Sequence, residues 1–408
     1  MNTQRRQFLA LASLAGAGAL LPTRFAFAGT SPQPNRFVLI LLRGALDGLA
    51  AVPPYGDPDY VALRRESAIG ADTALKLDGL FGLNPGLKFL HESYTARELL
   101  VMHAVATPYR ERSHFDGQDV LENGMQRAHA TQTGWLNRAL LALPAAQRAG
   151  SKDAGVALGQ NLPLVMRGPA PVASWSPSKL PAMEQDTLQR ISDLYAADPL
   201  LSQRLAAALD ANAVAASAQM SDAQTAALAR QPARGAAQYL ETVRAAGAFL
   251  RAEDGPAVAV FDTTGWDTHA NEGGVQGQIA IRLGALDQAL HSLKESLGPV
   301  WDRTAILIAT EFGRTAALNG TRGTDHGTGA AAFLLGGAVK GGRVLADWPG
   351  LSARSLYQGR DLMPTLDLRS VTKSVLRDHL GIPVRALEDK VFPDSRSAPY
   401  FDDLLRSV

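Results

Sequence analysis

Residues 37–48 read FVLILLRGALDG. The first six form a continuous apolar run, which predicts a central strand of a parallel sheet covered on both faces, since a half-exposed strand would alternate polar and apolar residues. The run ends at Arg43-Gly44, and Asp47 follows it. Parallel sheets hold their ligands at the carboxyl ends of their strands, so Asp47 is a candidate site residue, although Asp-Gly is also a common turn.

Four more short β-rich runs follow along the chain as candidate strands, separated by longer amphipathic segments. They span residues 99–103, 257–262, 304–310 and 331–335. This alternation predicts an α/β fold with a largely parallel central sheet flanked by helices. Residues 182–250 are rich in Ala, Leu, Gln and Arg with helical spacing, and they predict a helical insertion or a helical layer on the sheet. We interpret the Pro- and Ser-rich residues 169–181 as the connection into it, and expect one large domain over residues 36–408.

The first 28 residues have the pattern of an export signal. Arg5-Arg6 precede an uncharged stretch rich in Leu, Ala and Gly, and Ala26-Phe27-Ala28 matches an A-x-A cleavage site. This pattern predicts a twin-arginine signal peptide, the twin-arginine export machinery as a partner, and a periplasmic or extracellular protein. The alternative, a buried N-terminal helix, leaves the arginines and the cleavage site unexplained. No other apolar run reaches the about 18 residues of a membrane span, so we expect no stable span after cleavage.

Charge argues against a nucleic-acid partner, and the absence of cysteine excludes disulfides and thiolate metal sites. The 408 residues carry a formal charge of +1, and the first 28 contribute three arginines and no acid, so we expect no nucleic-acid partner. The chain has no cysteine, which excludes disulfides and thiolate metal ligands. Asp, Glu and His remain as metal ligands, a set that suits Zn, Mn or Ca.

Polar residues suited to a metal or an anion follow the predicted strands. Ser113-His114-Phe115-Asp116 opens a predicted helix. Ser113 is placed either to cap this helix or to act as a nucleophile at its N-terminus, where free amides attract a phosphate or sulfate group, and both interpretations stay open. Further along, Asp267 and His269 follow the strand 257–262, and from a strand end both can bind one cation.

A second polar group follows the strand 304–310. Glu311 and Arg314 come first, and Asp325-His326 lie between glycines, which let the backbone approach an ion or anion closely. Arg314 can pair with Glu311, clamp an oxyanion or form an ordinary surface ion pair. We interpret four histidines in helix-like segments as structural or surface residues: His91, His129, His291 and His379.

Five motifs together resemble a bacterial family, domain-of-unknown-function family 1501. They are RGALDG at 43–48, SHFD at 113–116, GWDTH at 265–269, EFGRT at 311–315 and GTDHG at 323–327. The resemblance runs from about Arg36 to the C-terminus. That family is in turn similar, more loosely, to the alkaline phosphatase and sulfatase superfamily. The resemblance therefore implies a three-layer α/β sandwich and an exported metal-dependent hydrolase of phosphate or sulfate esters.

The superfamily resemblance also implies roles for single residues. Carried over in chain order, it implies Ser113 as the nucleophile and one or two divalent metal ions. Arg314 is a further catalytic candidate on the residue evidence alone, as a clamp for an oxyanion. The ligands of the first ion would be Asp267, His269 and His326.

The second implied ion has an incomplete set of ligands. Asp47 and Glu311 would hold it. Phe312 stands where the superfamily has a histidine, and phenylalanine cannot bind a metal. This ion therefore lacks a ligand unless His114 or Asp325 replaces it.

An alternative alignment sets Asp325-His326-Gly327 on the superfamily's Asp-His-Gly motif, which restores that histidine but leaves no final one. Because the choice affects catalysis, three functions stay open. The first is hydrolysis of a small or polymeric anionic ester. The second is metal binding without catalysis by a protein that binds a partner or polymer, and the third is hydrolysis or group transfer at another type of bond with a single ion.

Overall fold

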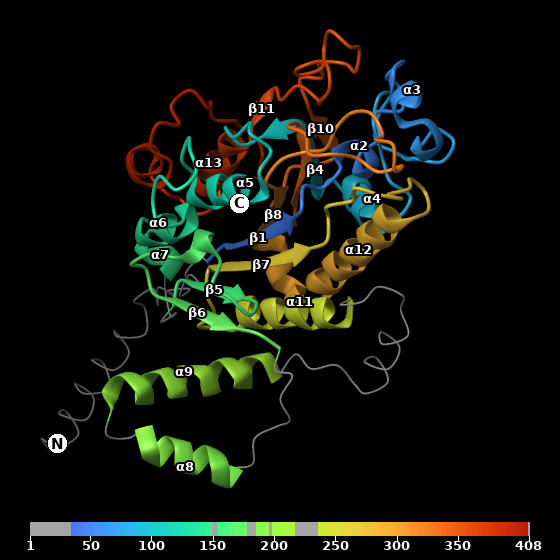
Figure 1. The fold of residues 1–408 in the computed structure, drawn as a ribbon. Helices are drawn as coiled ribbons and strands as arrows, with labels where there is room; N and C mark the ends of the chain where they lie inside the picture. Colours follow the sequence, from blue (N-terminus) through green and yellow to red (C-terminus); the bar gives the residue numbers. More distant parts are fainter. Residues whose placement is uncertain (1–33, 149–152, 178–184, 196–197, 217–235, 407–408) are drawn as a thin grey trace, which may run out of the picture. The chain divides into compact units, whose positions relative to one another are not determined.

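β1 (Arg36–Arg43) runs through the middle of the sheet that organises this protein (Figure 1). The computed structural model describes residues 34–148, 153–177, 185–195, 198–216 and 236–406. Within them, the sheet has nine strands in the order β10-β4-β9-β8-β1-β7-β5-β6, with β11 paired to β4. The predicted signal peptide over residues 1–28 lies outside the described residues.

The strands of this sheet are short and mostly buried. Besides β1 they are β4 (Leu99–Ala106), β5 (Gly155–Leu158), β6 (Val172–Trp175), β7 (Val258–Thr264), β8 (Thr304–Thr310), β9 (Ala330–Leu335), β10 (Arg343–Leu345) and β11 (Leu366–Asp367). β9 is antiparallel to its neighbours β4 and β8, and all other pairs in the sheet are parallel. The prediction of a largely parallel sheet is confirmed. A separate antiparallel pair is formed by β2 (Leu75–Lys76) and β3 (Gly82–Leu83).

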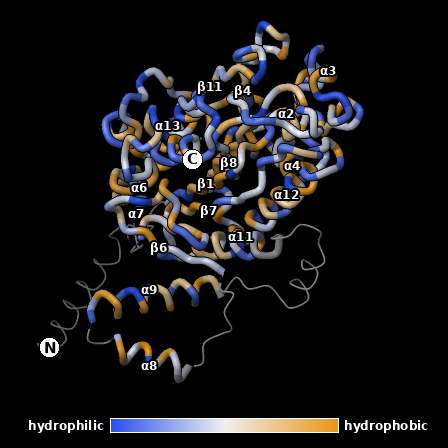
Figure 2. Tube along the Cα trace, in the orientation of Figure 1, coloured by the Kyte–Doolittle hydropathy of each residue, from blue (hydrophilic) through white to orange (hydrophobic). Residues whose placement is uncertain are grey.

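The apolar run of β1 serves two separate cores. Val38, Ile40 and Leu42 belong to one buried cluster, and the alternate residues 37, 39 and 41 belong to another on the opposite face. Side chains alternate between the faces of a strand, so a strand covered on both sides must be apolar throughout. Figure 2 shows this region of the sheet in hydrophobic colours.

Helices cover both faces of the sheet, which gives three layers (Figure 1). The first cluster contains apolar residues of α2 (Gly48–Ala51), α4 (Lys88–Thr95), α9 (Pro199–Ala216), α11 (Ala236–Arg251) and α12 (Gln278–Leu297). The second contains residues of α5 (His114–Asn123), α6 (Trp135–Leu141) and α13 (Leu368–Asp378). The remaining described α-helices are α3 (Tyr60–Arg64), α7 (Ala145–Arg148), α8 (Gln185–Tyr195) and α14 (Val384–Ala386). The predicted α/β class is confirmed.

Two helices of the predicted insertion, α9 and α11, contact strands of the sheet, and α8 contacts α9. α11 packs on α12 and contacts β7, while α9 contacts β6 and α11. The indole of Trp175 in β6 donates a hydrogen bond of 3.1 Å to Asn212 in α9. β6 itself corrects our interpretation of residues 169–181 as a connection. Its four residues pair in parallel with β5, the preceding strand of the chain. None of the helices in the described part of the chain combines the length and the apolar character needed to cross a membrane.

Strand register brings the loops of the site to one edge of the sheet. Arg43 at the end of β1 pairs with Thr264 at the end of β7, and Leu42 pairs with Thr310 at the end of β8. Because β9 is antiparallel, it begins at the edge where β8 ends. The residues that follow β1, β7 and β8 and those that precede β9 therefore meet.

Candidate metal centre

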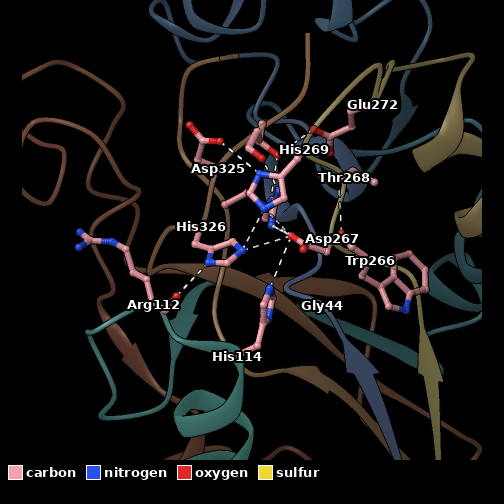
Figure 3. A network of polar contacts seen from close by, with 12 residues as sticks. Gly44, Arg112, His114, Trp266, Asp267, Thr268, His269, Glu272, Asp325 and His326 are labelled. Carbon is pink, nitrogen blue, oxygen red and sulfur yellow. Dashed lines mark hydrogen bonds and ion pairs between the residues drawn. The ribbon is translucent and has the colours of Figure 1, made fainter. Parts of the chain in front are cut away.

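Three imidazoles from separate segments face one carboxylate (Figure 3). His114 starts α5, His269 follows β7, and His326 precedes β9. The Nε2 atoms of these three rings lie 3.5, 3.0 and 3.3 Å, respectively, from Oδ1 of Asp267. The Nε2 atoms of His269 and His326 are 3.1 Å apart. We call these four residues the histidine cluster.

The other ring nitrogen of each histidine has a partner outside the cluster. Nδ1 of His114 lies 2.8 Å from Oε1 of Glu311. The corresponding partners are Asp325 Oδ1 for His269, at 3.2 Å, and the Arg112 carbonyl for His326, at 2.9 Å. A neutral imidazole has one N–H, and when Nδ1 donates it, the lone pair of Nε2 points into the cluster. This arrangement is typical of metal-binding histidines.

Glu311 positions His114 and lies outside the cluster. Its buried carboxylate also accepts hydrogen bonds from the amide of Gly44 at 2.8 Å, from Gln118 at 3.1 Å and from the Thr310 hydroxyl at 2.9 Å. Burial by itself would raise the pKa of Glu311, but the hydrogen bonds from His114 and these donors keep it below its usual value. The hydrogen bond to Glu311 in turn raises the pKa of His114. Since its oxygens are already bonded, the structure does not bring Glu311 to a metal position.

Asp267 is held by Arg314, which is buried. Nη1 of Arg314 donates to Oδ1 of Asp267 at 2.5 Å, and its Nε donates to the Thr324 hydroxyl at 3.1 Å. Burial alone would raise the pKa of Asp267, but Arg314 lowers it below the usual value. Arg314 therefore pairs with Asp267 and not with Glu311, and its place in the core contradicts a surface ion pair.

Asp47 lies outside the histidine cluster. Its carboxylate caps α2, accepting from the amides of Leu49 at 2.9 Å and Ala50 at 3.2 Å, and it forms a buried ion pair with Arg64. Burial would raise the pKa of Asp47, but Arg64 keeps it low. Both oxygens are engaged, so the expected second ion at Asp47 and Glu311 has no free carboxylate to hold it.

Two buried residues next to Asp47 were not singled out from the sequence. One is Arg64, whose segment carries no motif. The other is Glu272, whose pKa is raised well above its usual value by burial and by the charge of Asp47. Oε2 of Glu272 accepts a hydrogen bond of 2.8 Å from Thr324, which in turn accepts from Arg314. Arg64 therefore holds Asp47, and Glu272 holds Thr324, which bonds to Arg314.

Ser113 occupies the N-cap position of α5, and Asp116 lies in the first turn, as predicted. The Ser113 side chain makes no hydrogen bond to the first turn, so Ser113 stands at the N-cap without supplying a capping hydrogen bond. Phe312 packs on the cluster: its ring stacks on His114, with centroids 4.9 Å apart, and lies 5.4 Å from the ring of His326. Phe312 therefore fixes these rings by contact.

Glycines allow the segments of the site to approach one another. Gly44 has a φ of 116°, and a Cβ there would lie 2.7 Å from the amide nitrogen of Asp267. A Cβ at Gly323 would lie 2.3 Å from the carbonyl carbon of His269. A side chain does not fit at either position, which agrees with the predicted need for glycine near Asp325-His326.

The residues present fit a divalent cation. Nε2 of His114 is buried and has no hydrogen-bond partner among the described residues. One ligand atom from each of His114, Asp267 and His326 lies within 4.8 Å of the others. An unpartnered buried nitrogen is unfavourable unless a proton or an ion satisfies it. Nitrogen and carboxylate donors together are a common ligand set for transition metals.

Solved structures with a distant likeness to this chain include three proteins. The first is Ps i-CgsB in complex with k-i-k-neocarrahexaose, at 12% identity over 74% of this chain and 66% of that one, just under two thirds of its length, with a TM-score of 0.32. The second is the C-terminal periplasmic domain of EcEptC from Escherichia coli in complex with Zn, at 11% identity over 75% and 74%, with a TM-score of 0.30. The third is the phosphonate monoester hydrolase of Agrobacterium radiobacter, at 13% identity over 86% and 74%, with a TM-score of 0.32.

No curated protein matches this chain. The family model described as a protein of unknown function (DUF1501) matches residues 93–391, which is more than half of the chain. The matched range contains the histidine cluster and the residues that bond to its rings. The chain therefore belongs to the DUF1501 family.

Proposed function

We propose that this protein is an exported hydrolase of phosphate or sulfate esters that works with one divalent metal ion. The observation that carries the proposal is the convergence of three imidazole Nε2 atoms on the carboxylate of Asp267, with each Nδ1 bonded elsewhere. Such convergence leaves nitrogen lone pairs facing one another, which a cation compensates. The four residues of the histidine cluster would hold the ion.

The donor set narrows the choice of metal. Three nitrogens and one carboxylate suit Zn or Mn, whereas Ca prefers a shell of oxygens. One ion is proposed because the carboxylates of Asp47 and Glu311 are bonded to Arg64 and His114. Among Zn, Mn and Ca, we therefore favour Zn and Mn.

Ser113 is the proposed nucleophile. It precedes His114 at the N-terminus of α5, where free backbone amides favour an anionic group. Its hydroxyl oxygen would attack phosphorus or sulfur, the ester bond would break, and the alcohol would leave. Water would then hydrolyse the serine ester, releasing phosphate or sulfate and restoring the hydroxyl. A bound ion would polarise the ester and lower the pKa of an attacking hydroxyl.

Export is part of the proposal. The twin-arginine pattern at Arg5-Arg6 suits a protein that folds and acquires its metal before it crosses the membrane. We therefore propose a periplasmic or extracellular location, with the twin-arginine machinery as a partner and residues 1–28 removed. The substrate would be an anionic ester that the protein meets outside the cytoplasm.

A second candidate function is metal binding without catalysis. Phe312 favours it, because its ring packs on two of the three histidines and supplies no ligand. In that case the ion would act as a staple for the fold. The two candidates differ in whether any ester is cleaved when the metal is bound.

The test measures metal content first and turnover second. Elemental analysis should find about one Zn or Mn per wild-type chain, and none in Asp267→Asn or His326→Ala. His129→Gln is the matched control, since that side chain is 73% exposed and lies outside the cluster. The metal-loaded protein is then assayed on aryl phosphate monoesters, diesters and aryl sulfates beside Ser113→Ala.

Each outcome selects a candidate. Turnover by the wild-type protein that is lost in Ser113→Ala, with metal retained, supports the hydrolase. Bound metal without turnover on any ester supports the non-catalytic candidate. A wild-type protein that binds no Zn or Mn contradicts both.

A further inference from the structure

A large cleft lies beside the histidine cluster. It has a volume of about 1230 Å³ and is lined by Phe115 and Trp266, which are the chain neighbours of the cluster residues His114 and Asp267. Figure 3 shows Asp267 pointing toward the histidines and Trp266 beside it pointing away from them. Pockets for small ligands have volumes of about 300–1,000 Å³. The cleft therefore has room for much more than a single phosphate or sulfate monoester.

The acidic side chains of the cleft are bonded to other protein groups. Glu122 and Asp262 both pair with Arg43, at 2.7 and 2.5 Å. Asp119 accepts from the side chain of Asn123 at 2.6 Å and from the amide of His129 at 2.7 Å. Arg43 bonds to both carboxylates, so its guanidinium is not free to bind a ligand, and it offsets the charge of one of them. The three carboxylates already accept hydrogen bonds from protein groups.

Two other guanidinium groups of the cleft have no carboxylate partner among the described residues. Arg282 in α12 donates from Nη2 to the amide oxygen of Gln278 at 3.2 Å, and its buried Nε has no hydrogen-bond partner within that part of the chain. Arg167 donates from Nε to the carbonyl of Leu162 at 3.0 Å. Arg282 is partly buried, and a partly buried guanidinium favours a bidentate anion as its partner. Among the described residues, the guanidinium groups of this cleft that no carboxylate occupies are therefore those of Arg167 and Arg282.

The backbone at the end of β7 makes room for Arg282. Gly265 has a φ of 95°, and a Cβ there would lie 3.0 Å from Nη1 of Arg282. Gly265 lies two residues before Asp267, so the guanidinium sits against the loop that carries the cluster carboxylate. An anion bound by Arg282 and an ester at the cluster would occupy neighbouring positions along one ligand.

The uncharged lining suits sugar rings. The side chain of Phe115 is 87% exposed although it adjoins the cluster. An exposed large aromatic side chain in a cleft offers a flat apolar face for a ligand. The exposed side-chain amides of Gln160 and Asn161 line the same cleft and can hydrogen-bond to hydroxyl groups.

We infer that the cleft binds an anionic polysaccharide, with Arg167 and Arg282 binding anionic groups other than the ester at the histidine cluster and Phe115 stacking on a sugar ring. The inference rests on the proposed function, because only that function makes the bound polysaccharide a substrate. It deepens the proposed function by naming the substrate class. Binding in the cleft itself does not require turnover. It can therefore be tested with the metal removed.

The test is calorimetric titration of the metal-stripped full chain with dextran sulfate. Arg282→Gln should weaken binding by about tenfold, which is the loss of ~1.4 kcal/mol, and Arg167→Gln should weaken it in the same direction. Phe115→Ala should weaken it by about fivefold. Arg385→Gln is the matched control, because Arg385 is 93% exposed and lies outside the cleft. Thermal unfolding of each variant checks that it is folded.

Neutral dextran and inorganic polyphosphate are the comparison ligands. Neutral dextran should bind weakly, and polyphosphate should bind without dependence on Phe115. Equal binding of dextran sulfate by wild type, Arg282→Gln and Arg167→Gln overturns the inference. Polyphosphate binding that exceeds dextran sulfate binding, together with no effect of Phe115→Ala, overturns the assignment to a saccharide. If the wild-type chain binds dextran sulfate through Arg282 but binds no metal, the cleft assignment stands and the proposed function fails.

Discussion

The rings of the histidine cluster differ in how firmly the hydrogen bond at Nδ1 holds each ring. Glu311, which bonds to His114, is buried, whereas the Asp325 side chain, which bonds to His269, is 54% exposed. A hydrogen bond in a buried site is stronger than one in contact with water. The orientation of His114 should therefore depend on Glu311 more than that of His269 depends on Asp325.

Replacing Glu311 by Gln should weaken zinc binding by about 10–100-fold, the usual effect of losing a group that orients a metal-binding histidine. The amide removes the negative charge that stabilises His114, and its NH2 group opposes the donors that surround it. Zinc affinity is measured by competition with a chromophoric chelator. Glu98→Gln is the matched control, since Glu98 pairs with Lys294 at 2.6 Å away from the cluster. Unchanged zinc affinity in Glu311→Gln would show that His114 is not held in this way.

The Asp47–Arg64 ion pair permits a second prediction. Arg64→Met leaves a buried carboxylate without its counter-ion and should lower the free energy of unfolding by about 3–5 kcal/mol. Metal content should stay at the wild-type value, because Asp47 faces Arg64 and not the histidines. Urea unfolding and elemental analysis measure the two quantities.

Lys340→Met is the control for Arg64→Met, because Lys340 forms an exposed pair with Asp403. Exposed pairs contribute about 0–1 kcal/mol, so this change should have little effect. Metal content above the wild-type value in a folded Arg64→Met protein would return Asp47 to the set of ligands.

At the scale of elements, the sequence predicted the positions of strands better than it predicted the roles of single residues. The predicted strands at 37–42, 99–103, 257–262, 304–310 and 331–335 all coincide with strands of the sheet, because each contains a run of buried apolar residues. The polar groups after them were thereby assigned to one edge of a sheet. β5 and β6 were missed, since each is only four residues long and gives too short a pattern to distinguish a strand from a loop.

α13 is linked to β1 through His379, which permits a prediction about acid stability. Nε2 of His379 donates to the carbonyl of Arg36 at 2.9 Å, and burial lowers its pKa to about 4. In the unfolded chain the pKa is about 6.5. Between these values the unfolded state binds more protons, so the free energy of unfolding falls as the pH falls from about 6.5 to about 4, by roughly 3 kcal/mol for this residue.

His379→Gln should lose less stability across that window, because the amide can keep the hydrogen bond to Arg36 and does not titrate. Urea unfolding at about pH 7 and about pH 5 gives the comparison. His129→Gln, at an exposed position, should lose as much stability as wild type. An identical acid dependence in His379→Gln and wild type would show that His379 does not titrate as the buried group described here.

At the scale of the whole molecule, the site depends on an arrangement that spacing along the chain does not show. Antiparallel β9 starts where β8 ends, so His326 returns to the edge at which Asp267 leaves β7. The sequence placed Asp267, His269 and His326 together by resemblance. It could not show which carboxylates face the cluster and which are bonded elsewhere. The pairing of Asp47 with Arg64 and the orientation of Glu311 toward His114 are tertiary contacts between distant segments.

The histidine cluster joins segments of both halves of the chain, so metal removal should affect the stability of the whole fold. A ligand that binds only the native state stabilises it by ~2.7 kcal/mol at a free concentration of about 100 times its Kd. A chelator should therefore lower the unfolding temperature of wild type by a few degrees, and added Zn should restore it. Asp267→Asn should unfold at the same temperature with and without chelator, because no ion binds to be removed. A chelator-sensitive Asp267→Asn protein would place the stabilising ion elsewhere in the molecule.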